Sequence, residues 1–216
     1  MKKPVVWLGV ALLAVMTLAL GLAWPVGGTD RTALCAANLK ALHAAMGRYA
    51  QDYDGYYPPA VNTLSAGQTW LWWFDYLKPY TPDARVFCCP SSAKAAEFGV
   101  YDPPEPLLPP AAFSPYTVSY GMNIYFDPRV TKGVSYRPET IIAPDAVPVF
   151  ADAQGFLVSA FRTGWNVTTP HDGALNVCVA SGAVFLARPD YQADGTYVLR
   201  ALADSRALKW APRDSK

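Results

Sequence analysis

The side chains in this chain that could do covalent or metal chemistry are four cysteines and two histidines. His171, Cys178 and Asp152 are the residue types that supply a base, a thiol nucleophile and an orienting acid in a hydrolase. Cys178, however, lies between Val177 and Val179 in a run typical of a β-strand, whereas a nucleophile of this kind stands on an exposed turn. We therefore expect no catalytic residue, and the chain is predicted not to be an enzyme.

The cysteine spacing also argues against a structural metal site. Cys88 and Cys89 are adjacent, whereas paired zinc ligands usually have two residues between them so that both sulfurs reach one ion. His43 falls at the edge of an apolar helix stripe and gives no functional signal. From the sequence we expect no metal and no cofactor.

Length and charge limit the classes of partner. The chain has 216 residues, of which 52% are hydrophobic, which is enough for one domain with a core. Its 18 basic and 17 acidic residues give a net charge of +1, so no long-range field attracts phosphates. We therefore expect no nucleic-acid partner and no small-molecule substrate.

The first residues predict a membrane anchor. The range Val5–Val26 contains no charged residue, and a helix rising about 1.5 Å per residue over this length crosses a hydrocarbon core of roughly 30 Å. Lys2 and Lys3 precede it, and basic residues favour the cytoplasmic side. We expect residues 4–26 to contact membrane lipid as a single-pass, N-in/C-out anchor, with the domain periplasmic or extracellular. A cleaved secretory signal, with Gly21-Leu22-Ala23 as its small-residue site, is the alternative.

The chain is predicted to have three parts. Residues 1–28 form the anchor or signal peptide and a hinge, because Pro25 and Gly27-Gly28 interrupt helix continuity. Residues 29–205 form a single domain. Residues 206–216 form a C-terminal tail.

A long amphipathic helix is expected to open the domain. Thr29 or Asp30 can cap it, and Asp54-Gly55 stops it after about Tyr53. Lys40 and Arg48 lie opposite an apolar stripe, which must pack against a sheet or another helix. The stripe consists of Cys35, Leu39, Leu42, Met46, Tyr49 and Tyr53.

The middle of the chain gives weaker signals. The range Trp70–Leu77 is apolar on nearly every side, which predicts a short helix inside the core. Its residues Trp70, Trp72 and Trp73 could instead be exposed and form an interaction surface. Prolines concentrate between residues 90 and 148, which predicts irregular loops. An edge-type strand is expected over residues 141–151, ending near Asp152.

A β-hairpin is the clearest signal near the C-terminus. Two β-rich runs, residues 176–180 and 183–187, flank Ser181-Gly182, which suits a tight turn. The range Thr196–Leu199 adds a third antiparallel strand. The predicted fold class is α+β: an N-terminal transmembrane helix, then an amphipathic helix packed on a small antiparallel sheet with long irregular Pro-rich loops.

The four cysteines are expected to be oxidised outside the cytoplasm. A disulfide from Cys35, on the apolar stripe, to Cys89 would close a loop of about 55 residues and stabilise the fold by about 4 kcal/mol in a chain-entropy argument. Cys88 and Cys178 then either pair with each other or remain buried thiols.

Four short elements between residues 35 and 182 resemble a known family. They are C-A-A-N-L-K at 35–40 with Y-A-Q-D-Y-D-G-Y-Y-P-P at 49–59, V-F-C-C-P-S at 86–91, S-Y-G-M-N at 119–123, and the stretch from His171 to Gly182. In this order they resemble the type IV pilin-like and type II secretion pseudopilin-like family, a large bacterial prepilin-like group with a His-x9-Asp-Gly element that is His-x9-Ser-Gly here. The matching positions are Asn38, Leu39, Lys40, Pro90, Tyr120, Asn123, His171 and Gly182.

This resemblance implies a pilin-like fold and a non-enzymatic, membrane-anchored structural or assembly component of the cell envelope or of a secretion system. It also implies other exported or pilin-like proteins as partners. The family's cleavage signal is missing, because Lys3-Pro4-Val5-Val6-Trp7 stands in its place. The alternative function is an exported binding module that recognises polysaccharide or peptide through its aromatic cluster.

Overall fold

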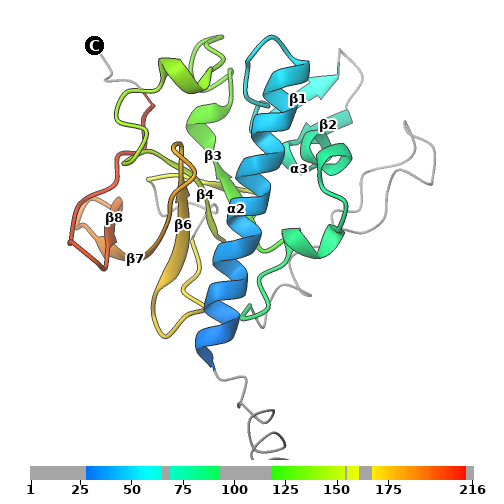
Figure 1. Cartoon of the computed structure of the whole chain (residues 1–216). Coiled ribbons are helices and arrows are strands. Elements are labelled where there is room, and N and C mark those ends of the chain that lie inside the picture. Colours follow the sequence, from blue (N-terminus) through cyan, green and yellow to red (C-terminus); the bar gives the residue numbers. More distant parts are fainter. Residues whose placement is uncertain (1–27, 65–68, 93–117, 154, 161–166, 213–216) are drawn as a thin grey trace, which may run out of the picture. The chain divides into compact units, whose positions relative to one another are not determined.

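The computed structural model describes residues 28–64, 69–92, 118–153, 155–160 and 167–212 (Figure 1). The chain divides into two compact units, Met1–Asp30 and Arg31–Lys216. All features described below belong to the second unit, apart from the first residues of its long helix.

Helix α2 (Gly28–Asp52) confirms the predicted amphipathic helix. Its apolar stripe is buried from Cys35 to Tyr49, whereas Lys40 and Arg48 are exposed. The helix ends because Asp54 and Gly55 have left-handed backbone angles, with φ of 52° and 81°. Tyr53, predicted to be the last stripe residue, lies beyond this end and is 52% exposed.

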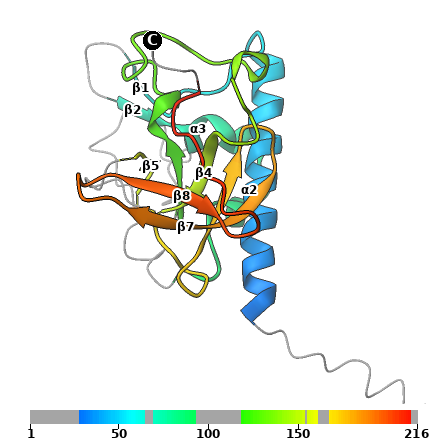
Figure 2. The ribbon, with the colours of Figure 1, turned by 90° about the vertical axis from the view of Figure 1, so that its left-hand side faces the viewer.

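Six strands form the main sheet (Figure 1). They are β3 (Tyr120–Asn123), β4 (Pro148–Asp152), β5 (Leu157–Val158), β6 (Leu175–Val179), β7 (Val184–Tyr191) and β8 (Tyr197–Ala201). Their order across the sheet is β5-β3-β4-β6-β7-β8. Strands β3 and β5 are parallel, and all other neighbours are antiparallel, so the sheet is mixed. Figure 2 shows α2 running along one side of this sheet.

The predicted hairpin is confirmed as β6 and β7, and the predicted third strand as β8. Gly182 makes the turn with φ of 86°, a value that costs glycine little. A Cβ atom at this position would also lie 2.9 Å from Nδ1 of His43 on α2. The turn therefore needs glycine both for its backbone angle and for its close approach to the helix.

The tryptophan-rich segment differs from the predicted helix. Its first half is strand β2 (Thr69–Trp72), which pairs with β1 (Val61–Leu64), and only its second half is helical, as α3 (Trp73–Leu77). Strand β4 is also not at an edge, because it lies between β3 and β6. It tolerates Pro148 because this is its first residue. Short 3₁₀ turns complete the described part: η2 (Lys78–Tyr80), η3 (Ala84–Phe87), η5 (Ile124–Phe126) and η6 (Pro138–Thr140).

Both faces of the main sheet are buried at β3, β4 and β6. On β6, Cys178 packs into the core under α2, whereas its neighbours Val177 and Val179 pack into a second core on the other face. Leu208 and Trp210, from the segment predicted to be a tail, are buried in this second core. The folded region therefore extends past residue 205.

The predicted fold class is wrong. We expected a transmembrane helix followed by an α+β domain with a small antiparallel sheet. The described residues instead form a six-stranded mixed sheet and a two-stranded sheet, with α2 and α3 as the α-helices. The sheet was underestimated because β3 and β5 lie in or next to the proline-rich region and are too short to show a periodic pattern.

The predicted single-pass, N-in/C-out location is also corrected. Within the described ranges, no helix has both the length and the apolar character needed to cross a membrane. The segment predicted to contact lipid, residues 4–26, lies outside the described residues.

Candidate functional site

Four side chains of types that can ligate a metal ion lie close together under the first half of α2. Cys35 comes from the helix, Cys89 from the segment after η3, Asp152 from the end of β4, and His171 from the segment before β6. All four residues are buried. Their ligand atoms all lie within 4.8 Å of one another. We call this group the buried cluster.

The predicted disulfide between Cys35 and Cys89 is present. It links α2 to a segment 54 residues further along the chain. Cys88 and Cys178 do not form a second disulfide; the first is half-buried and the second is buried.

His171 has a contact at each ring nitrogen. Its Nδ1 lies 3.1 Å from Oγ1 of Thr32 on α2. Its Nε2 lies 3.1 Å from Oδ2 of Asp152, 3.0 Å from Nδ2 of Asn176 and 3.7 Å from Sγ of Cys89. The imidazole thus connects the helix, the sheet and the disulfide.

Asp152 is a fully buried carboxyl group. Its Oδ2 accepts a hydrogen bond of 2.7 Å from the backbone N–H of Asn176, whereas its Oδ1 is buried without a hydrogen-bond partner. Burial raises the pKa of the carboxyl, and the hydrogen bonds from His171 and Asn176 offset this rise only in part. Asp152 is therefore a buried acceptor with unused capacity.

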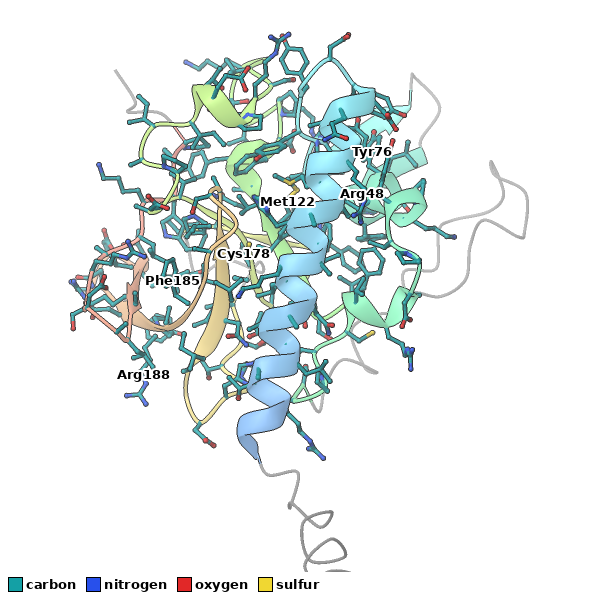
Figure 3. The ribbon with its side chains drawn as sticks, in the orientation of Figure 1. Arg48, Tyr76, Met122, Cys178, Phe185 and Arg188 are labelled. Carbon is teal, nitrogen blue, oxygen red and sulfur yellow. A yellow bond between two sulfur atoms is a disulfide. The ribbon has the colours of Figure 1, made fainter. Side chains whose placement is uncertain are left out.

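The two cysteines outside the disulfide, Cys88 and Cys178, do not have the properties of an activated nucleophile. Burial raises the pKa of the Cys178 thiol to about 12, and it also raises the pKa of Cys88. Cys178 donates a weak hydrogen bond to the Val179 carbonyl, at 3.6 Å. Figure 3 shows it on β6, and it belongs to the same core as Met122 on β3. The sequence suggested His171 and Asp152 as partners of Cys178. In the structure His171 instead contacts Cys89 and Asp152.

Several of the residues on which the resemblance to the pilin-like family rests make hydrogen bonds between separate elements. Nδ2 of Asn38 donates to the carbonyl of Cys88 at 2.9 Å and lies 3.4 Å from the hydroxyl of Tyr120. Nδ2 of Asn123 donates to the carbonyls of Pro148 and Trp210, both at 2.8 Å. Leu39 is buried under the helix, whereas Lys40 and Pro90 are exposed.

The three predicted surface tryptophans do not share one exposed face. Trp73 has no exposed surface, and its Nε1 donates to the carbonyl of Phe156 at 2.7 Å. Trp72 is half-buried against the ring of Phe156. The side chain of Trp70 lies outside the described residues. Trp73 is therefore core, and only Trp72 is placed where it could contact a ligand.

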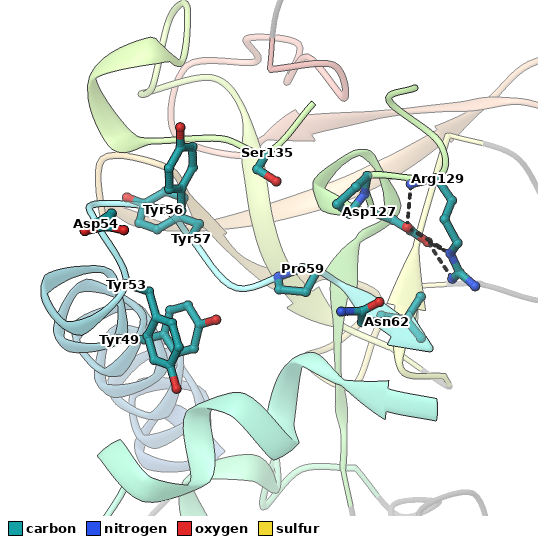
Figure 4. Close-up of a pocket in the computed structure, with 12 residues that line it drawn as sticks. Tyr49, Tyr53, Asp54, Tyr56, Tyr57, Pro59, Asn62, Asp127, Arg129 and Ser135 are labelled. Carbon is teal, nitrogen blue, oxygen red and sulfur yellow. Dashed lines mark hydrogen bonds and ion pairs between the residues drawn. The ribbon is translucent and has the colours of Figure 1, made fainter. Parts of the chain in front are cut away.

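A pocket of about 530 Å³ lies beyond the end of α2, between the helix exit and the segment after η5 (Figure 4). Tyr49 and Tyr53 stack on its helix side, with ring centroids 4.1 Å apart. Asp127 and Arg129 form an ion pair of 2.7 Å on the opposite side. We call this the tyrosine pocket, and its lining includes Tyr49, Tyr53, Tyr56, Tyr57, Pro59, Asn62, Asp127, Arg129 and Ser135.

The sequence did not predict this pocket. The four tyrosines between residues 49 and 57 could have indicated it, but their pattern was interpreted as the apolar stripe of the helix and the segment that follows it. A second, more apolar hollow of about 580 Å³ shares Val61, Asp127 and Arg129 with the tyrosine pocket and is also lined by Trp72.

Comparison of the chain with family models, with curated proteins and with solved structures finds no match.

Proposed function

We propose that this chain is a non-enzymatic structural or assembly component of a cell envelope or secretion system, with a role like that of pilins and pseudopilins. The observation that carries the proposal is the position of the motif residues. Asn38, Asn123 and His171 make buried or partly buried contacts between elements, and none of them lines the tyrosine pocket. Such residues serve a scaffold rather than a reaction.

The scaffold holds α2 firmly against the sheet. Near its start the helix is joined by the disulfide of Cys35 and by the contact of Thr32 with His171. In its middle, Nε2 of His43 lies 3.0 Å from the carbonyl of Ala180 in the β6–β7 turn. A helix fixed along its buried face presents its outer face in one orientation, which suits repeated contact with a partner.

The outer face of α2 is suited to contact with another helix. Leu34 is 53% exposed on this face. Small side chains let two helices approach closely, because interaxial distance depends on the residues at the contact. The small residues around Leu34 on this face are Ala33, Ala37, Ala41 and Ala44. We assign this face to contact with another copy of the chain or with a pilin-like partner.

Substitution of Leu34 by glutamate tests this assignment. We expect Leu34→Glu to weaken self-association or partner association of the full chain by at least about tenfold, because burial of an unpaired charge at a contact is costly. Sedimentation velocity and chemical cross-linking in mild nonionic detergent would measure the association. The unfolding midpoint should not change, since Leu34 lies outside the core.

Leu202→Glu is the matched control. Leu202 is a leucine of similar exposure, 45%, directly after β8. Equal effects of the two substitutions, or no association of the wild-type chain at any concentration, would contradict assembly through α2.

The two adjoining hollows favour a second candidate, a module that binds polysaccharide or peptide. The stacked rings of Tyr49 and Tyr53 offer an apolar platform. Across the pocket, the ion pair of Asp127 with Arg129 and the amide of Asn62 offer polar contacts, a combination that carbohydrate and peptide sites use. We expect Tyr53→Ala to remove any binding of oligosaccharides or proline-rich peptides seen by fluorescence titration. Tyr191→Ala, which removes a tyrosine of matched exposure outside the pocket lining, should leave that binding intact. Equal affinities of the two variants would rule out the tyrosine pocket as the binding site.

A further inference from the structure

The buried cluster has the composition of a metal site. Two sulfurs, an imidazole nitrogen and a carboxylate oxygen come from four separate segments and lie within 4.8 Å of one another. Thiolate and imidazole ligands with a carboxylate are a donor set that zinc accepts. We propose that Cys35, Cys89, His171 and Asp152 bind one zinc ion when the disulfide is reduced, so that the disulfide and the zinc dithiolate are alternative states of one site.

The distances already present are close to those of a tetrahedral zinc site. Zinc bonds of about 2.3 Å to sulfur and about 2.0–2.1 Å to nitrogen or oxygen place neighbouring S and N ligands roughly 3.5 Å apart, and N and O ligands roughly 3.4 Å apart. Sγ of Cys89 lies 3.7 Å from Nε2 of His171, and this nitrogen lies 3.1 Å from Oδ2 of Asp152. The two sulfurs must move apart, from bonding distance to roughly 3.8 Å.

The surrounding contacts are those that orient metal ligands. Oγ1 of Thr32 contacts Nδ1 of His171, which directs Nε2 into the cluster. The backbone N–H of Asn176 holds Oδ2 of Asp152 in place. The side-chain amide of Asn176 is now 3.0 Å from Nε2 of His171 and would move away from that nitrogen when the ion binds. It would keep its hydrogen bond to the Thr32 carbonyl, at 3.2 Å.

The unpartnered carboxylate oxygen is an independent indication. Asp152 is fully buried, and its Oδ1 has no hydrogen-bond partner. Buried polar atoms are normally satisfied, and an exception calls for an explanation such as an ion. A cation that contacts both oxygens of this carboxylate, with Oδ2 as the nearer ligand, would supply the interaction that Oδ1 lacks.

The change of state is a balanced reaction. A dithiol reductant transfers two electrons and two protons to the Cys35–Cys89 disulfide, which becomes two thiols while the reductant becomes a disulfide. Zinc then binds both sulfurs as thiolates, and the two thiol protons are released to solvent. Nε2 of His171 and Oδ2 of Asp152 complete the ligand set as electron-pair donors, so their binding involves no change of oxidation state.

Zinc binding by the full chain in mild nonionic detergent tests the proposal. The protein is reduced with a phosphine, which gives the same two thiols and becomes a phosphine oxide, and zinc is counted by atomic emission after gel filtration. We expect about one zinc per reduced chain and none per oxidised chain. Cobalt in place of zinc should give thiolate charge-transfer absorption and the visible bands of a tetrahedral ion.

Variants separate this site from adventitious thiol binding. Asp152→Asn and His171→Gln keep both cysteines and should lower zinc affinity by at least about tenfold. Cys88→Ser, which removes a thiol that lies next to the cluster but outside it, should leave zinc content unchanged. Circular dichroism of the oxidised variants, compared with oxidised wild type, shows whether they fold. If His171→Gln does not fold, Asp152→Asn alone decides.

Three results would overturn the proposal. The first is a reduced wild-type chain that binds no zinc. This includes a chain that unfolds on reduction and does not recover the circular dichroism spectrum of the folded protein when zinc is added. The second is zinc content that falls in Cys88→Ser. The third is zinc affinity that is the same in wild type and in Asp152→Asn.

Discussion

Removing the Cys35–Cys89 disulfide is expected to lower the free energy of unfolding by about 4 kcal/mol, because the bond closes a long loop and so restricts the unfolded chain. The two cysteines are 54 residues apart and both are buried. The double variant Cys35→Ala/Cys89→Ala, compared with oxidised wild type by urea unfolding, measures this effect. The slope of free energy against urea should rise as well, since the unfolded chain becomes more expanded.

Cys88→Ala is the control for this experiment. Its thiol is outside the disulfide and half-buried directly beside Cys89, so its removal should change stability by about 1 kcal/mol or less. A loss below about 1 kcal/mol in the double variant would show that the disulfide does not stabilise the fold as its loop length requires.

Trp73→Ala is expected to lower the free energy of unfolding by about 3–5 kcal/mol, the usual cost of removing a large aromatic side chain from a core. Trp73 has no exposed surface and its ring lies 4.9 Å from that of Phe150 on β4. The substitution also removes the indole N–H that donates to the Phe156 carbonyl, which keeps its hydrogen bond from the backbone N–H of Met122. Urea and thermal unfolding followed by far-ultraviolet circular dichroism would measure the loss.

Trp72→Ala is the matched comparison, because its half-buried ring loses less contact area. We expect a clearly smaller loss of stability there. If Trp73→Ala were as stable as wild type, the packing of α3 into the core would be wrong, and a ligand-binding role for this tryptophan would regain support.

Elements with a strong local pattern could be predicted from the sequence. Helix α2 has apolar residues at helical spacing over its whole length, and the β6–β7 hairpin has two β-rich runs around Ser181-Gly182. Both patterns involve neighbouring residues only. The bounds of the helix and of β6 were therefore predicted to within one or two residues, whereas β7 runs on to Tyr191, past the predicted end at residue 187.

Strands β3 and β5 could not be predicted, because what makes them strands is a distant partner. All residues of β3 are buried, so polar and apolar side chains do not alternate, and β5 has only two residues. A Cβ atom on Gly121 of β3 would lie 2.9 Å from the backbone of Leu157. The glycine of the S-Y-G-M-N element thus allows this close pairing, a reason that no local pattern contains.

The same limit applies to the candidate sites. The spacing of the adjacent pair Cys88-Cys89 predicted no zinc site. The buried cluster, however, contains only Cys89 of that pair, together with Cys35 from α2. The tyrosine pocket joins the helix exit to Asp127 and Arg129, which follow η5 far along the chain. Ligand sets and pockets built from distant segments depend on the strand order, which the sequence left open.

The position of the disulfide near the start of the second unit has a mechanical consequence. Cys35 lies about one helical turn after Arg31, the first residue of that unit. Tension applied to the chain ahead of Arg31 passes through the covalent bond into the segment after η3 before it reaches the rest of α2. The remainder of the helix, from Leu39 onward, cannot be peeled off the sheet by such a pull while the bond is intact.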